Sequence, residues 1–250
     1  MHDMKYSNIQ SSIANIRPLL AREFVSYFNS PIAYVFAAVF LVVTNWIFFQ
    51  QFFLINQALM RDWFGFLPWV FLFLAPAITM RSWAEEKKSN TIEFLLTLPI
   101  KDSEVVIAKF FSSFFFLAIV LGLSLALPIA IGRLGDVDSG VVVAGYVGAL
   151  LLGGLYLSIG LLISSFTRNQ IVAFLLSLCA MFVLYIVGSG VVLLFLQGPI
   201  AGVLQYISAA THFSSMSRGV FDTRDIVYYI SFTLFFLYLN TESIGSRKWR

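Results

Sequence analysis

Apolar residues fill six long stretches of the chain that are nearly free of charge. The hydrocarbon core of a bilayer is about 30 Å thick, and about 20 apolar residues cross it as a helix. Because backbone in lipid must satisfy its own hydrogen bonds, stretches this long predict helices. The sequence therefore predicts an all-α integral membrane protein, a single transmembrane domain over residues 1–250. Its six transmembrane helices are expected at residues 31–54, 63–80, 105–131, 141–165, 171–196 and 226–239.

A segment of different character precedes the first of these stretches. Apolar residues recur at helical spacing from Ile13 to Phe28. The other side of this helix is predicted to carry Asn15, Arg17, Arg22, Glu23 and Ser26. The segment is too polar to cross a membrane, so residues 13–30 are predicted to form an amphipathic helix in the cytoplasmic interface. A docking helix for a soluble partner is the alternative.

The basic residues predict which way the helices cross. Lys and Arg gather in the cytoplasmic loops of membrane proteins. With the N-terminus in the cytoplasm, twelve of the sixteen Lys and Arg residues fall on the cytoplasmic side and four outside. We therefore expect both termini in the cytoplasm.

One long loop, from Arg81 to Lys109, falls on the predicted cytoplasmic side. Asn90 followed by Glu93 resembles a capping box, which predicts a helix starting near Thr91. Pro99 is expected to end this helix about two turns later. The sequence thus predicts a short helix between the second and third spans.

This short helix is expected to expose Ile92, Leu95 and Leu96 on one side. Apolar side chains at a water-facing surface need a cover. Either the ends of the protein's own helices and the lipid interface cover them, or a partner protein does. The residues alone leave both alternatives open.

Two further patterns concern the membrane interior and the outer side. The fourth stretch carries Gly145, Ala149 and Gly153 at four-residue spacing, which allows close helix packing, either within the chain or across a dimer. Residues 197–225 are predicted to form short helices that re-enter the outer leaflet. Because amides facing lipid are costly, some polar residues of the first helix are candidates for lining a translocation path, namely Asn45, Gln50 and Gln51.

Composition and missing motifs exclude several functions. Only 12% of the residues are charged, against about 25% in soluble domains, so the positive net charge of +3 indicates cytoplasmic loops rather than nucleic-acid binding. No phosphate-binding G-x-x-x-x-G-K-[ST] loop occurs. His2 and His212 lie far apart, and no cluster of nucleophile, base and acid is visible. We therefore expect no catalytic site, no bound cofactor and no metal.

Several strings of residues resemble one family of transporters. They are Met80-Arg81, Ala84-Glu85-Glu86-Lys87, Thr91-Ile92-Glu93 and Leu95-Leu96-Thr97-Leu98-Pro99-Ile100, together with the segments 23–34, 164–170, 212–222 and 247–249. This combination resembles the type-2 ATP-binding-cassette (ABC) permeases, and is most similar to their gliding-motility-type branch. That branch commonly has Gly before the Thr, where Asn90 stands here.

The resemblance implies how such a chain works. It implies a dimer with a second permease copy or a homologue in the bacterial inner membrane, with an auxiliary envelope protein as a further candidate partner. Two copies of a separate ATPase subunit, which bind ATP and Mg²⁺, dock on the cytoplasmic side. The implied contacts with the ATPase are Glu85, Glu86, Thr91, Ile92, Glu93, Leu95, Leu96 and Pro99. The implied docking residues of the amphipathic helix are Arg17, Arg22, Glu23 and Phe24.

The function predicted on this basis is that of a non-catalytic permease subunit. It couples ATP hydrolysis in its partner to export or to mechanical transduction. The alternatives are an ATP-independent channel or ion-coupled carrier, and a membrane scaffold of an envelope machine such as a gliding-motility apparatus. Apart from Lys109 near the entry of its helix, the six stretches hold no ionisable residue, which disfavours a proton-driven carrier.

Overall fold

The computed structural model describes residues 16–55, 60–93, 100–133, 138–195 and 198–246, and these residues contain helices and turns but no strand. Residues 16–28 form a helix ahead of α2. The helices that follow are α2 (Pro31–Ile55), α3 (Met60–Thr79), α4 (Ala84–Lys88), α6 (Asp102–Ser124), α7 (Ala126–Ile131), α8 (Ser139–Ser164), α9 (Gln170–Ile186), α10 (Gly190–Phe195), α11 (Pro199–Ile207), α12 (Ala209–Met216) and α13 (Thr223–Gly245). The expectation of an all-α chain is confirmed for the described residues.

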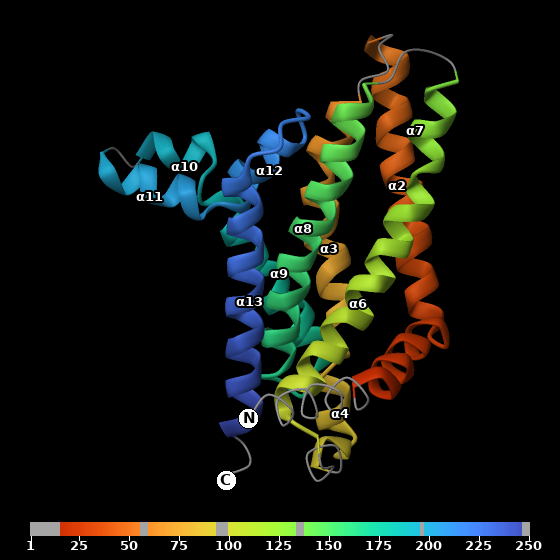
Figure 1. The fold of residues 1–250 in the computed structure, drawn as a ribbon, viewed down its shortest axis with the longest axis vertical. Helices are drawn as coiled ribbons and strands as arrows, with labels where there is room; N and C mark the ends of the chain where they lie inside the picture. The colour runs from red at the N-terminus through yellow and green to blue at the C-terminus, as the bar shows by residue number, and fades with distance from the viewer. Residues whose placement is uncertain (1–15, 56–59, 94–99, 134–137, 196–197, 247–250) are drawn as a thin grey trace, which may run out of the picture.

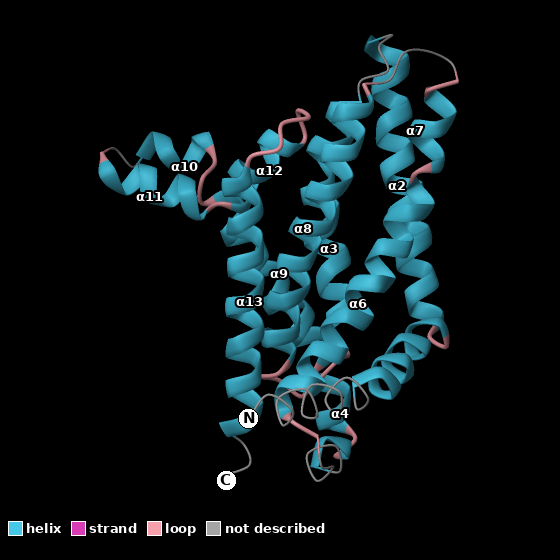
Figure 2. Cartoon of the chain, in the orientation of Figure 1, coloured by secondary structure: helices cyan, strands magenta, loops and turns pink. Residues whose placement is uncertain are grey.

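The long helices run side by side along the long axis of the molecule in alternating directions (Figure 1). Helix α4 and the helix of residues 16–28 lie at one end of this bundle, which we call the α4 end. Helices α7 and α12 lie toward the other end, which we call the far end. Short turns join most of the helices (Figure 2), so sequence neighbours pack as antiparallel pairs.

Four helical segments are long and apolar enough to cross a membrane by length and composition. They are Pro31–Gln50, Met60–Lys88, Asp102–Ile131 and Ser139–Ser164. Helix α9 is apolar but has only 17 residues. Helix α13 has 23 residues, but its second half carries Asn240 and Glu242. Four of the six predicted spans therefore coincide with candidate membrane spans, and for α9 and α13 the span stays a prediction.

Helix α8 is the centre of the bundle and packs against α3, α6, α9, α12 and α13. Its glycines let these neighbours approach closely. A Cβ atom added at Gly145 would lie 2.5 Å from the ring of Phe64, and one at Gly160 would collide with the side chain of Thr79. The small residues of α8 thus serve packing within the chain, which was one of the two alternatives that the spacing left open.

The predicted fifth helix, residues 171–196, is wrong in its second half. Helix α9 ends at Ile186, and α10 and α11 project sideways from the far end (Figure 1). The turn between α9 and α10 brings the backbone of Gly188 against Ser208, where a Cβ atom would collide. The short helices α11 and α12 lie within residues 197–225, as predicted, but their depth in a leaflet is untested. The predicted third helix is interrupted at Leu125, where α6 gives way to α7.

Candidate functional site

A buried lysine organises the α4 end. Lys109 is only 2% exposed on the first turns of α6. Its Nζ atom lies 3.1 Å from Glu23 Oε2 and 2.7 Å from Glu86 Oε1, and 4.9 Å from the ring centroid of Trp83. Because an ammonium group buried this deeply needs compensating charge, the two carboxylates and the indole face hold it in place. The cluster joins α6 to α4 and to the helix of residues 16–28.

Glu23 lies on the packed face of its helix, and the prediction that placed it on the polar side is wrong. It shares this face with Leu19 and Tyr27, whose ring stacks on Phe116 at 5.2 Å. Arg22 Nη2 donates to Glu23 Oε1 at 2.8 Å. Burial by itself raises the pKa of the Glu23 carboxyl, but Lys109 and Arg22 outweigh burial and bring that pKa below its ordinary value. Glu23 is therefore held as the anion that Lys109 requires.

The loop between the second and third spans contains a helix, α4, that the sequence did not predict, and a further helix begins at Thr91 as predicted. Helix α4 spans Ala84–Lys88, and Asn90 follows it with φ = 56°. This left-handed conformation is typical of the residue just after a helix C-terminus and differs from the extended N-cap that the capping-box interpretation requires. Asn, like Gly, adopts this conformation more readily than other residues do, so the backbone here suits the residue that occupies it. Residues 91–93 are helical again.

The end of α8 clamps the turn that leads into α4. The hydroxyl of Ser164 accepts hydrogen bonds from the backbone N–H groups of Trp83, at 3.1 Å, and Ala84, at 3.2 Å, and it donates to the carbonyl of Met80 at 3.2 Å. The buried ammonium of Lys87 donates to the carbonyl of Ser165, the residue that ends α8. A cation at a helix C-terminus is favourable, because the last carbonyls carry partial negative charge. Nothing in the sequence pattern indicated these contacts.

Arg81 ties the same turn to the beginning of α2. Its Nε and Nη2 atoms lie 2.8 and 3.1 Å from the two carboxylate oxygens of Glu85, and its Nη1 atom donates to Ser30 Oγ at 2.7 Å. Such a two-pronged Arg–carboxylate pair fixes both side chains in orientation. Helix α4 is thus attached to α2, α6, α8 and the helix of residues 16–28 together.

The predicted ATPase contacts differ in exposure. Thr91 and Glu93 are exposed, and the side chains of Glu85 and Glu86 are 47% and 18% exposed. Ile92 is only 8% exposed and belongs to the hydrophobic core, so the expectation that it is exposed is wrong, since the chain itself covers it. Leu95, Leu96 and Pro99 lie outside the described residues.

The predicted docking residues of the first helix also divide into two groups. Arg17 and Arg22 are exposed, whereas Phe24 is half-buried and contacts Phe28 with ring centroids 5.1 Å apart. Glu23 faces Lys109, as described above. Of these four predicted docking residues, only the two arginines are therefore exposed to a partner.

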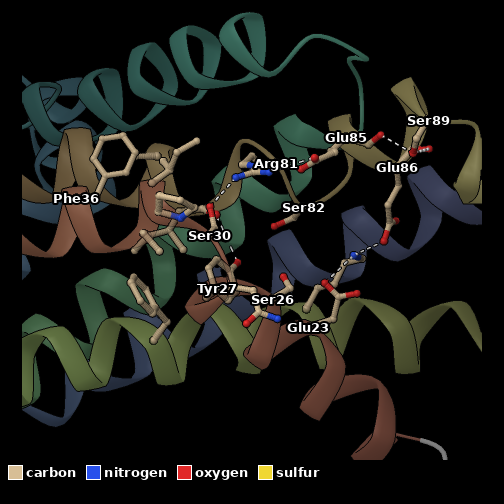
Figure 3. Close-up of a pocket in the computed structure, with 18 of the residues that line it drawn as sticks. Glu23, Ser26, Tyr27, Ser30, Phe36, Arg81, Ser82, Glu85, Glu86 and Ser89 are labelled. Atoms are coloured by element: carbon tan, nitrogen blue, oxygen red, sulfur yellow. Dashed lines mark hydrogen bonds and ion pairs between the residues drawn. The ribbon is translucent and has the colours of Figure 1, made fainter.

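A cleft of about 690 Å³ opens between the helix of residues 16–28, the start of α2, and the turn before α4. Figure 3 shows Arg81 and Glu85 on one wall, Tyr27 and Ser26 on the opposite wall, and Phe36 deeper along α2. Lys109 and Glu86 also line the cleft. The cleft therefore combines charged and apolar walls.

The candidate path-lining residues do not join this cleft. The side-chain amide of Asn45 donates to the carbonyl of Leu41 in its own helix at 2.6 Å. Gln50 is exposed on α2, and the side chain of Gln51 lies outside the described part of the chain. One amide hydrogen of Asn45 is therefore bonded within its own helix, and a path-lining role stays a prediction.

A second polar cluster lies at the far end. His212 on α12 contacts Asp225 in the first turn of α13, with 2.6 Å between Nδ1 and Oδ1, and its Nε2 atom lies 2.8 Å from the carbonyl oxygen of Tyr206. Ser215 donates to the other carboxylate oxygen of Asp225. His212 and Ser215 both contact the carboxylate and do not contact each other in the way a nucleophile and its base must. The cluster fastens α12 to α13, and no group of three or more His, Cys, Asp or Glu side chains in the described residues could hold a metal ion.

The chain was compared with models of protein families and with curated proteins. The family described as "ABC-2 family transporter protein" matches residues 5–241 of the chain. The match covers the first helix, the turn around α4, and nearly all of α13. No curated protein matches the chain.

Proposed function

The chain belongs to the ABC-2 family of transporter proteins and is a multi-pass membrane permease component, and on that premise we propose that it transmits work from a separate ATPase subunit docked at its α4 end. The ATPase binds ATP and Mg²⁺, and this chain supplies the moving helices. Two ATPase copies dock on two permease chains. One of these is this chain, and the other is a second copy of it or a homologue. The work drives export or mechanical transduction.

The way α4 is attached carries the proposal. Its turn is bonded to α8 through Ser164, to α6 through Glu86 and Lys109, and to the start of α2 through Arg81. A displacement of α4 is therefore passed to three long helices at once. Beside these buried anchors, the exposed residues Lys88 and Glu93 offer charged contacts to a soluble partner.

The proposed orientation places the α4 end in the cytoplasm of a bacterial inner membrane. Twelve basic residues then lie inside and four outside, with α9 and α13 counted as spans. Both termini are cytoplasmic, as is the helix of residues 16–28, which lies along the interface with its arginines toward the partner. The likeness to the gliding-motility branch, and an auxiliary envelope protein, remain part of this proposal.

The docking surface is tested by removing its exposed side chains without touching its anchors. In the triple variant Lys88→Ala, Thr91→Ala and Glu93→Ala, co-purification of the co-expressed ATPase is expected to weaken about tenfold or more, because a few contact residues dominate an interface. Membrane insertion and the thermal transition in detergent are expected to stay unchanged, since all three side chains are exposed.

Three exposed arginines at the far end provide the matched control, Arg61→Ala, Arg218→Ala and Arg224→Ala. This variant should retain the ATPase fully. An ATPase that stays bound to the α4-end variant with undiminished turnover would contradict the docking assignment. Transport by the purified chain in liposomes without any nucleotide-hydrolysing partner would contradict the division of labour and favour a channel or carrier.

A further inference from the structure

The cleft at the α4 end has two chemically different halves. Its mouth is lined by Arg81, Glu85 and Glu86, with several hydroxyl groups between them. Its depth is lined by Phe36 of α2, Ile78 of α3 and Phe116 of α6. A molecule that fills both halves must carry a polar, charged head and an apolar tail.

The apolar half reaches the depth of lipid acyl chains. Phe36 lies six residues beyond Ser30, and Phe116 seven residues beyond Lys109, so both residues stand about 9–11 Å deeper along their helices than these polar side chains. Both helices belong to segments that can cross a membrane. Ile32, at the side of the cleft, is 42% exposed. Because a soluble protein does not reach this depth, a lipid of the adjoining leaflet fits the cleft better than an ATPase loop.

The polar half selects for a head group that contains both an amine and a phosphate. Glu86 Oε2 is buried without a hydrogen-bond partner among the described residues, although Glu86 Oε1 is bonded to Lys109. Arg81 uses three of its five N–H donors on Glu85 and Ser30, and about two remain for an acceptor. A buried acceptor without a partner is costly. Because Glu86 lines the cleft, a rotation of its carboxylate that turns Oε2 into the cleft lets a donor from a ligand relieve that cost.

The charge of the residues that line the cleft also favours a zwitterionic head group. Three carboxylates, from Glu23, Glu85 and Glu86, face two cations, Arg81 and Lys109. A head group with a net negative charge would enter a lining that is already net negative. A zwitterionic head adds no net charge and offers the ammonium donor that Glu86 lacks.

We propose that this cleft binds an ethanolamine phospholipid from the leaflet at the α4 end. Its ammonium group donates to Glu86 Oε2, and its phosphate accepts from Arg81. One acyl chain lies along Phe36, Ile78 and Phe116. This binding goes beyond the proposed function and does not depend on an ATPase, so the purified chain alone can test it.

The test measures lipid binding to the purified, detergent-solubilised chain by native mass spectrometry. Phosphatidylethanolamine is compared with phosphatidylcholine, whose methylated ammonium cannot donate a hydrogen bond, and with phosphatidylglycerol, which has no amine. We expect phosphatidylethanolamine to bind about tenfold more tightly than either, as one charged hydrogen bond to a buried acceptor implies. Free phosphoethanolamine, the head group alone, is expected to bind at least about tenfold more weakly, because it leaves the apolar half empty.

Two variants assign the binding to the cleft. Glu86→Gln is expected to remove the preference for phosphatidylethanolamine over phosphatidylcholine. Glu23→Gln is its matched control, because Glu23 also contacts Lys109 but has both oxygens already bonded, and this variant should keep the preference. Ala33→Phe, which fills the cleft, should weaken all three lipids, whereas Val35→Phe on the exposed face of α2 should not. If Ala33→Phe fails to fold, Ser26→Trp fills the cleft from an exposed position instead.

Several results would overturn the assignment. Equal affinity for the three lipids would show that the cleft does not discriminate between head groups. A preference for phosphatidylethanolamine that survives Glu86→Gln would show that another residue recognises the head group. Binding of free phosphoethanolamine as tight as that of the lipid would exclude the acyl-chain contact. If the cleft-filling variants leave lipid binding unchanged and instead weaken ATPase co-purification, the cleft is a protein-docking surface.

Discussion

Replacing Lys109 by methionine tests the charge cluster at the α4 end. Without its ammonium group, the nearest oxygens of Glu23 and Glu86 face each other, and because they lie 3.1 and 2.7 Å from the same Nζ atom, they are at most about 6 Å apart. Two unit charges at that distance repel by about 3 kcal/mol at an effective dielectric constant of about 20. Breaking a buried pair typically costs about 3–5 kcal/mol, so we expect Lys109→Met to destabilise the chain by that amount.

The assay is equilibrium unfolding in detergent micelles, followed by loss of helical circular dichroism. The triple variant Lys109→Met, Glu23→Gln and Glu86→Gln separates charge from packing. It removes all three charges but keeps side chains of similar size, so its stability is expected within about 1–2 kcal/mol of the natural chain. If Lys109→Met costs less than about 1 kcal/mol, or the triple variant is as unstable as the single one, the cluster does not hold the fold as argued.

Acid should stabilise the Lys109→Met variant relative to the natural chain. In the natural chain the two carboxylates respond in opposite directions, because burial raises the pKa of Glu86 and its protonation stabilises the fold, whereas protonation of Glu23 destabilises it. The folded pKa of Glu23 lies below its ordinary value of 4.5, so its stabilising contribution is fully present above pH 4.5 and is lost as the pH falls through the folded pKa. In Lys109→Met the two crowded carboxylates repel each other, so taking up a proton stabilises the folded chain. The stability difference between the two chains is therefore expected to narrow below about pH 5. A difference in unfolding free energy between the two chains that stays constant down to pH 4 would contradict the electrostatic explanation.

Three further substitutions probe packing, backbone and the far end. Gly160→Ala should cost about 1–3 kcal/mol, because its Cβ atom collides with Thr79, whereas Gly122→Ala, with open space around it, should cost nothing measurable in the same unfolding assay. Asn90→Val should lower the unfolding free energy by about 1–2 kcal/mol, because a β-branched residue is strained at this left-handed position. Asn90→Gly should change it by no more than about 0.5 kcal/mol, and equal stabilities of the two variants would contradict the role of Asn90 at the helix end. His212→Ala should cost about 3 kcal/mol by leaving the buried carboxylate of Asp225 short of a partner, and proteolysis between α12 and α13 should accelerate.

The membrane-crossing stretches were the part of the fold that the sequence revealed best. Hydropathy reports burial in lipid directly, and the starts of α2 and α8 fall within two residues of the predicted ones. The end of α9 was missed because residues 187–196 are as apolar as the helix before them. Gly188-Ser189-Gly190 was the available signal for a turn, but glycines are common inside membrane helices and do not mark an end by themselves.

The charge cluster could be predicted only in part. Lys109 stood out as an ionisable residue in an apolar stretch, and such a residue requires a partner. Nothing in the sequence says which carboxylate supplies it, since Glu23 and Glu86 lie 86 and 23 residues away along the chain. The polar assignment of Glu23 failed for a related reason. A helical pattern ranks residues by hydrophobicity, and it cannot foresee that a charged residue on the packed face meets a buried charge of the opposite sign.

The attachment of α4 also limits how this chain can move under the proposed function. Trp83 is fully buried, and its backbone N–H donates to Ser164 at the end of α8. Lys87 and Lys109 are nearly buried, and their ammonium groups bond α4 to the end of α8 and to α6. Separating either lysine from its partners would leave a buried charge uncompensated, at a cost of about 3–5 kcal/mol. A stroke delivered to α4 is therefore cheaper to accommodate by moving the α4 end as one body than by sliding α4 past its neighbours. The bending must then occur farther along the helices, where the break between α6 and α7 at Leu125 already interrupts the regular hydrogen bonding of a helix.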